Sequence, residues 1–146
     1  MSTPPVPLRM VEVSGAEALW LIEGSSSGRL VYVQRDLTAV RPARHVWEYG
    51  RLVVRTPAPA AAVPVTATYH VDEVRAVHGT GWTVTVSGPA DVITDPDEAA
   101  LPHCLKGMGG APIRRTLTGW THGPHDTLLR LHPKTVSGFR LARAEA

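Results

Sequence analysis

Apolar and polar residues alternate along much of this chain, which is the pattern of strands with one buried face. The clearest example begins at Trp82, where apolar residues at 82, 84 and 86 alternate with threonine and serine, up to about Ile93. Segments rich in β-branched and aromatic residues, each bounded by turn residues, predict further strands. These segments are Arg29–Gln34, Thr38–Trp47, Arg51–Thr56, Val65–Val74, Thr127–Leu131 and Thr135–Leu141.

Two other segments carry the signals of helix starts. Residues 14–17 form a capping-box pattern, a serine followed three positions later by a glutamate, ahead of an apolar stretch. The pattern predicts a short helix from about Ala16 to Glu23, ended by the glycine- and serine-rich residues 24–28. The acidic residues of segment 95–98 favour a second helix, which should run to about Leu105.

Six or so short strands with hairpin-length turns predict a mainly β domain, either a Greek-key barrel or a sandwich, with a few short helices. Pro42 lies inside one predicted strand and donates no backbone hydrogen bond, so it indicates a sheet edge or a bulge there. Residues 1–13 are expected to form a flexible tail, since prolines at positions 4, 5 and 7 remove backbone donors. Residues 14–146 then form the domain.

Composition restricts the class of protein. A chain of 146 residues with 43% hydrophobic and 19% charged residues fits one globular domain. Cys104 is its one cysteine, so neither a disulfide framework nor a cysteine-rich zinc site is expected. The sequence shows neither a signal-peptide pattern nor an apolar run of about 18 residues, so we expect no membrane span and a cytoplasmic location.

The charge pattern favours a small ligand over a nucleic acid. The net charge is +2, the basic residues are scattered, and only 5% of residues are aromatic, so a stacking platform for bases is not expected. A mildly basic pocket for a phosphate-bearing small molecule fits better. His122 and His125 are separated by glycine and proline and have no glutamate at metalloenzyme spacing, so we expect no metal site.

The order of several short motifs resembles that of a known family. The motifs are Gly28–Val31, Ala39–Ala43, Gly50–Thr56, Tyr69–Glu73, Gly81–Ala90 and Leu128–Leu141. In this order and spacing, over residues 14–141, the chain resembles the pyridoxamine 5′-phosphate oxidase-like family of FMN-binding split barrels. The resemblance implies a six-stranded Greek-key split β-barrel, flavin mononucleotide (FMN) as cofactor, and a homodimer of barrels that share two cofactor sites. Some relatives bind a deazaflavin or haem instead.

The resemblance also implies where a cofactor would lie. The isoalloxazine ring is expected along Arg41, Pro42, Ala43, Arg44 and His45. The phosphate is expected at Arg55 and Thr56, and further contacts at Trp82, Thr83 and Trp120. Several of these positions have a simpler interpretation: surface or edge-protecting arginines, an ordinary strand histidine at 45, and core packing for Trp82. Trp120 lies in an irregular segment with less core to fill, which favours a ligand or dimer contact. The resemblance identifies no catalytic residue.

One segment departs from the family pattern. The family usually places a glycine, a hydroxyl residue and a lysine after the Arg-Thr pair, at a helix start that binds phosphate. Here the segment is Pro57–Ala62, which contains only proline and alanine, so the phosphate site for FMN is expected to be weakened by the loss of a charged partner. We expect a flavin-dependent oxidoreductase that acts on a small molecule. The alternatives are a non-catalytic barrel that binds flavin, deazaflavin or haem, and a cofactor-free dimeric member.

Overall fold

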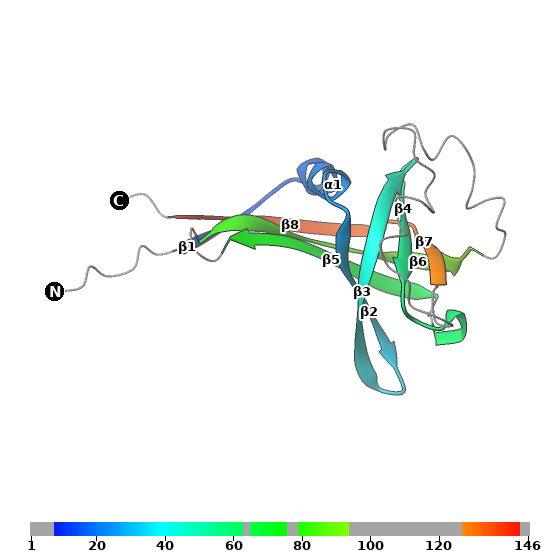
Figure 1. The fold of residues 1–146 in the computed structure, drawn as a ribbon. Helices are drawn as coiled ribbons and strands as arrows, with labels where there is room; N and C mark the ends of the chain where they lie inside the picture. The colour runs from blue at the N-terminus through cyan, green and yellow to red at the C-terminus, as the bar shows by residue number, and fades with distance from the viewer. Residues whose placement is uncertain (1–7, 63–64, 76–78, 94–126, 144–146) are drawn as a thin grey trace.

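The computed structural model describes residues 8–62, 65–75, 79–93 and 127–143 (Figure 1). These residues form one α-helix, one short 3-10 helix and eight strands. The strands are β1 (Leu8–Glu12), β2 (Ser27–Gln34), β3 (Leu37–Glu48), β4 (Arg51–Thr56), β5 (Thr66–Arg75), β6 (Thr80–Val92), β7 (Thr127–Leu131) and β8 (Thr135–Arg143). The helices are α1 (Gly15–Glu23) and the 3-10 helix η1 (Ala60–Ala62).

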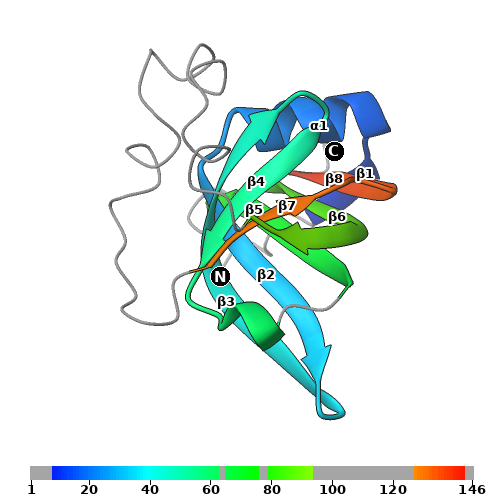
Figure 2. The same cartoon turned by 90° about the vertical axis from the view of Figure 1, so that its right-hand side faces the viewer.

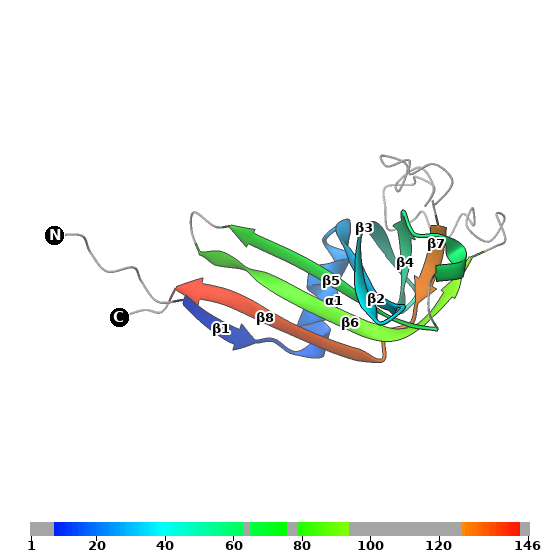
Figure 3. The same cartoon turned by 90° about the horizontal axis from the view of Figure 1, so that it is seen from below.

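All eight strands belong to one antiparallel sheet. Its order is β1-β8-β6-β5-β2-β3-β4-β7, and β7 also pairs with β6. The pairings among β6, β5, β2, β3, β4 and β7 therefore form a closed cycle of six strands (Figure 2). β6 serves both parts of the sheet, because residues 81–87 pair with β8 and residues 90–92 pair with β7. β8 and β1 extend away from the cycle as an arm (Figure 3).

Helix α1 begins where the capping pattern predicts. The Ser14 hydroxyl accepts a hydrogen bond from the backbone N–H of Glu17 at 3.1 Å, which satisfies one of the free donors of the first turn. The helix packs against β8, β6 and β3, and at its start Glu17 pairs with Arg140 of β8. Within the described ranges, no helix is long and apolar enough to cross a membrane.

One apolar cluster fills the space between α1 and the inner face of the strands. Its largest side chains have no exposed surface, and burial of each such side chain contributes about 1.5–3 kcal/mol. They are Ile22, Leu30, Leu52, Tyr69, Leu129 and Leu131. Strand alternation explains the arrangement, because on β6 the apolar residues 82, 84 and 86 point inward and the threonines and serine between them point outward.

Two-residue turns fix the register of two hairpins. Between β2 and β3 the turn residues Arg35 and Asp36 have φ angles of 50° and 64°, which are the left-handed values of a type I′ turn. Tyr49 and Gly50, with φ angles of 47° and 79°, make the same kind of turn between β3 and β4. Each residue of β2 therefore has a defined partner on β3, and each residue at the start of β4 has one at the end of β3.

Most of the predicted elements are confirmed. The predicted helix is α1, and the seven predicted strand segments correspond to β2 to β8 with small shifts at their ends. The helix expected to start near residue 95 lies outside the described residues. The mainly β class is confirmed.

Two expectations need correction. The sheet has eight strands rather than six in the described part of the chain, and the Greek-key barrel itself stays a prediction. The tail expected over residues 1–13 contains a strand, since Leu8–Glu12 pairs with the C-terminal strand from Leu8 opposite Arg143 onward. No hairpin-turn sequence predicts the β1–β8 pairing, because the two strands lie at opposite ends of the chain.

The interpretation of Pro42 as an edge residue is correct locally. β3 is a central strand, but its pairing with β4 starts only at Arg44 opposite Arg55. At Pro42 the strand therefore pairs only with Arg29 of β2 and has no partner on β4. The missing backbone N–H of proline is tolerated there because β3 does not need to form hydrogen bonds on both sides at this residue.

Candidate functional site

The face of the sheet opposite the core, the outer face, carries a row of residues from neighbouring strands. Arg29 of β2 lies opposite Pro42 of β3 on one side and opposite His70 of β5 on the other. His70 in turn lies opposite Thr85 of β6. Directly opposite residues of antiparallel strands project from the same face, with Cβ atoms about 4.5–5.5 Å apart. These four residues therefore stand side by side on the outer face.

A second row lies two residues away along the strands. Arg44 of β3 is opposite Ser27 of β2 and opposite Arg55 of β4. Residues two apart on a strand share a face, so Arg44 projects on the same side as Pro42. The outer face thus brings three arginines, at positions 29, 44 and 55, into a span of three strands, or about 10 Å.

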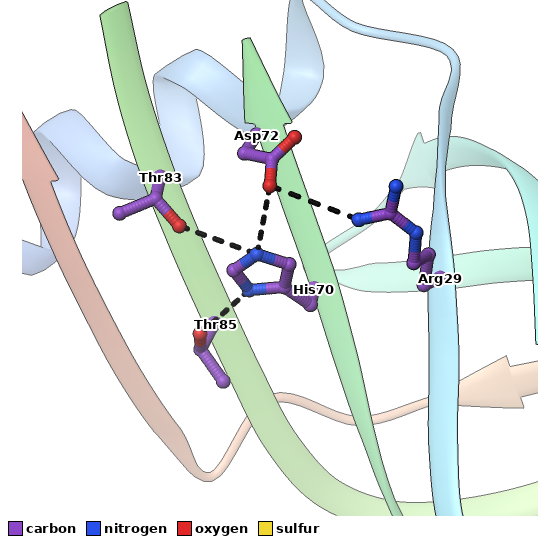
Figure 4. A network of polar contacts seen from close by, with 5 residues as sticks. All are labelled: Arg29, His70, Asp72, Thr83 and Thr85. Carbon is purple, nitrogen blue, oxygen red and sulfur yellow. Dashed lines mark hydrogen bonds and ion pairs between the residues drawn. The ribbon is translucent and has the colours of Figure 1, made fainter. Parts of the chain in front are cut away.

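His70 is the centre of a polar network on this face (Figure 4). Its Nε2 lies 3.2 Å from Asp72 Oδ2 and 3.4 Å from Thr83 Oγ1, and its Nδ1 lies 3.1 Å from Thr85 Oγ1. A carboxylate only accepts hydrogen bonds, so in the neutral ring Nε2–H donates to Asp72 and Nδ1 accepts from the hydroxyl of Thr85. The ring orientation is therefore set from both sides.

Arg29 completes the network through a looser ion pair. Its Nη1 lies 3.8 Å from Asp72 Oδ2, and the two side chains are 58% and 39% exposed. An exposed pair of this kind contributes only about 0–1 kcal/mol to stability. The guanidinium of Arg29 therefore lies near the network, and turning it toward an anionic ligand would cost little free energy.

A shallow pocket of about 290 Å³ opens beside these residues. It is lined by Ser27, Gly28, Arg29, Pro42, His70 and Asp72. A Cβ atom at Gly28 would lie 2.7 Å from the carbonyl oxygen of His70 and 2.8 Å from the ring of Tyr69, so only glycine fits there. The volume is at the lower end of the range for small-molecule sites, about 300–1,000 Å³.

The structure divides the residues predicted for the cofactor between two faces. Pro42, Arg44, Arg55 and Thr83 lie on the outer face. Arg41, Ala43, His45, Thr56 and Trp82 belong to the inner set by strand alternation, and all but Arg41 are buried. Trp82 and Thr83 are adjacent in β6 and point in opposite directions, so they do not line one site. Trp120 lies outside the described residues.

His45 has a structural environment. Its Nε2 lies 2.9 Å from the carbonyl oxygen of Ile22, and its Nδ1 lies 2.6 Å from the hydroxyl of Tyr69. Because a carbonyl only accepts, Nε2 carries the proton and Tyr69 donates to Nδ1. Burial lowers the pKa of His45 and raises that of Tyr69, so both stay neutral near neutral pH. Nε2 of His45 thus connects β3 to α1, and Nδ1 connects it to β5.

Thr56 and the segment after it also serve the fold. The Thr56 hydroxyl is buried and donates to the carbonyl of Pro42 at 3.2 Å. Ala58 is buried, and its carbonyl accepts a hydrogen bond from the Thr127 hydroxyl. The following residues form only the three-residue helix η1, which contains alanine alone. On the outer face beside this segment, Arg55 of β4 lies directly opposite Arg44 of β3.

The sequence analysis missed Ser27, Arg29, His70 and Asp72 as pocket residues. Arg29, His70 and Asp72 lie in motifs that resemble the family, but the resemblance gives them no ligand role, and only the register of β2 against β3 and β5 brings these residues together. In the described part of the chain, no group of three or more histidine, cysteine, aspartate or glutamate side chains could hold a metal ion.

Comparison with known proteins places this geometry in a family. A family model described as pyridoxamine 5′-phosphate oxidase matches residues 14–140. Protein Rv0080 of Mycobacterium tuberculosis is 28% identical over 149 residues, covering 96% of this chain and 91% of that protein. A FAD-binding protein from Mesorhizobium loti has the same fold, with a TM-score of 0.66 and 17% identity over 95% of this chain and 100% of that one. A FAD-binding protein from Mycobacterium smegmatis gives a TM-score of 0.59 and 16% identity, over 90% and 98% of the two chains. Because the family model matches most of the sequence, the chain belongs to the pyridoxamine 5′-phosphate oxidase family.

Proposed function

We propose that the protein binds FMN on the outer face of β2 to β5 and acts as a flavin-dependent oxidoreductase on a small molecule. The observation that carries the proposal is the cluster of Arg29, Arg44 and Arg55 on one face of the sheet, beside the pocket of about 290 Å³. An anionic, flat ligand fits a cationic rim and an open sheet surface. The FAD-binding proteins with the same fold support a flavin as that ligand.

Arg44 and Arg55 are the groups that would hold the phosphate. They are directly opposite on β3 and β4, and both are half-buried, which limits their freedom. A guanidinium offers a planar fork of donors that matches two phosphate oxygens. Two such groups compensate for the lysine and hydroxyl that the family pattern places after the Arg-Thr pair.

The bound flavin would supply the hydride or electron transfer, and the chain's own residues would bind and orient. His70 and Asp72 line the pocket and form its hydrogen-bonding wall, with the ring of His70 fixed by Thr85. Gly28 lines the pocket with its backbone, and its missing Cβ allows close packing against Tyr69 on the inner face of the sheet. The small pocket volume favours a small substrate beside the flavin.

The histidine geometry favours a flavin over haem. Axial ligation needs an unprotonated ring nitrogen directed at the iron. In the described residues, His45 and His70 use both ring nitrogens in contacts within the protein. Haem ligation by either residue would require breaking at least one of these contacts.

The test is a titration of FMN and riboflavin, followed by quenching of flavin fluorescence. Arg55→Ala should weaken FMN about ten- to a hundredfold, because one charged hydrogen-bonding partner contributes about 1.5–3 kcal/mol. Riboflavin lacks the phosphate and should bind the variant as it binds the wild type. Arg9→Ala removes an exposed arginine of β1 and serves as the matched control.

Three outcomes would count against the proposal or refine it. Equal losses for both flavins would mean that Arg55 supports the fold or the ring rather than the phosphate. If neither flavin binds the wild type, the deazaflavin and cofactor-free alternatives take its place. If small electron donors and acceptors react with the bound flavin no faster than with free FMN, the protein is a non-catalytic flavin carrier.

The homodimer belongs to the same proposal. Val33 and Val40 are 67% and 48% exposed on the projecting β2–β3 hairpin, on the same face as the arginines. A second copy would cover these side chains and could add a wall to a pocket that is shallow in one chain. Sedimentation at micromolar concentration should give twice 15.7 kDa, and a monomer would contradict the dimer.

A further inference from the structure

A second groove lies on the opposite side of the sheet from the proposed flavin site. It has a volume of about 330 Å³ and runs between the end of α1 and the adjoining parts of β5 and β6. Its lining residues are Trp20, Leu21 and Glu23 of α1, the C-cap residue Gly24, Glu73 of β5 and Trp82 of β6. Glu73 and Trp82 are direct partners in the β5–β6 pairing, so they project together on the inner face.

The charged groups of this groove are all acidic. Glu23 and Glu73 supply two carboxylates, and within the described part of the chain neither has an ion pair or a side-chain hydrogen bond. The C-terminal end of α1 also faces the groove, and its last turn contains no basic residue. The carbonyl groups at a helix C-terminus carry partial negative charge. The lining therefore carries two carboxylates and no described cation, and the neighbouring Arg140, opposite Trp82, is paired with Glu17.

The other main components are two indole rings. Trp82 is 8% exposed and forms part of the core, so it makes a fixed floor. Trp20 is 66% exposed on α1, an unusually large apolar surface to leave in water. The face of an indole ring attracts cations, most strongly when the cation is weakly hydrated. Two indoles with two carboxylates make a combination that recognises an organic ammonium group.

From these features we infer that the groove binds a small organic cation with a trimethylammonium or alkylammonium head. Trp20 and Trp82 contact the apolar surface of the head, and Glu23 and Glu73 balance its charge. A metal ion does not fit, because the lining holds two carboxylates and no third ligand among the described residues. The inference does not depend on flavin binding, which is proposed for the other face.

The experiment compares choline with 3,3-dimethylbutan-1-ol, which has the same shape but no charge. Binding is followed by the NMR signal of the Trp20 indole N–H, assigned by its loss in Trp20→Leu. Choline should shift the signal saturably, and the neutral compound should bind at least about tenfold more weakly, since cation–π attraction and the carboxylates act on the charge alone.

Variants separate the two components of the site. Trp20→Leu, followed by calorimetry, should weaken choline about five- to thirtyfold, and Glu73→Gln should weaken choline but not the neutral compound. Trp20 and Glu73 are exposed, so these variants should fold, whereas Trp82 is part of the core and is left intact. Asp36→Asn, which removes an exposed carboxylate at a hairpin turn, is the matched control.

Four results would overturn the inference. They are equal affinity for choline and its neutral analogue, no saturable shift with choline in the wild type, unchanged binding in both groove variants, and a loss in Asp36→Asn as large as in Glu73→Gln. Flavin titrations of the same preparations report separately on the outer face, so failure of one proposal leaves the other measurable.

Discussion

The buried pair of His45 and Tyr69 leads to a sharp prediction for Tyr69→Phe. Both residues have 0% exposed surface, their rings meet edge to face with centroids 5.0 Å apart, and the hydroxyl donates to Nδ1 at 2.6 Å. Phenylalanine preserves the ring packing but removes the donor. Nδ1 of His45 is then buried without a partner, because the proton on Nε2 is committed to the carbonyl of Ile22. An unsatisfied buried group of this kind costs about 1–3 kcal/mol.

The protein offers a matched control in Tyr32→Phe. Tyr32 is also buried, at 4% exposure, but its hydroxyl has no hydrogen-bond partner within the described part of the chain. Removal of that hydroxyl relieves a desolvated group, so the variant should be as stable as the wild type or more stable. The same chemical change at two buried tyrosines should therefore have opposite effects.

Urea unfolding followed by circular dichroism, near neutral pH, measures both variants. Tyr69→Phe should lower the midpoint at an unchanged slope, because the surface exposed on unfolding stays the same. If Tyr69→Phe loses less than about 0.5 kcal/mol, or if Tyr32→Phe loses as much, the hydrogen bond to His45 is not what stabilises this region.

Three further predictions concern stability. Burial lowers the pKa of His45 below 6.5, so as the pH falls through 6.5 only the unfolded chain takes up this proton. The free energy of unfolding should then fall by up to about 1.4 kcal/mol per pH unit. In His45→Gln, the urea midpoint should not show this dependence on pH. Gly81→Ala should destabilise by more than about 2 kcal/mol, since φ is +148° and the Cβ would collide with the Glu73 carbonyl, whereas Gly15→Ala in open space should be neutral or stabilising in thermal unfolding. Replacing Arg35 and Asp36 by asparagine and glycine should raise the melting temperature, by up to about 1 kcal/mol in free energy, because Asn-Gly suits the type I′ turn; a lower melting temperature would contradict the turn assignment.

Local signals were sufficient for most of the fold. The serine and glutamate of the capping box marked the start of α1 to within a residue, and alternation marked the strands from β2 to β8. β1 was missed because its strand character depends on β8, a partner at the far end of the chain. The closing of six strands by the β6–β7 pairing is equally non-local and leaves no mark in a short window of sequence.

The candidate site was predicted less well, for a geometric reason. The resemblance pointed to β3, which borders the candidate pocket, but it treated Arg41 to His45 as one surface, although successive residues of a strand face opposite sides. Arg29 and His70 were missed because only strand register places Arg29 between Pro42 on β3 and His70 on β5. That register depends on a turn at Arg35 and Asp36, where neither residue is glycine, so the composition did not reveal the turn type.

The pairing of β1 with β8 has a consequence for synthesis. The ribosome synthesises the N-terminal segment first, but Leu8 can pair with Arg143 only after residue 143 has been added. Glu17 and its partner Arg140 are likewise separated by 123 residues of sequence. During translation the strands of the β2–β3 and β3–β4 hairpins can already pair, while β1 has no strand to join. The exposed, partly apolar β1, with Met10 and Val11, is then a natural binding segment for a chaperone or for a neighbouring nascent chain. The β1–β8 pairing can consequently form only after the strands of both hairpins have been synthesised.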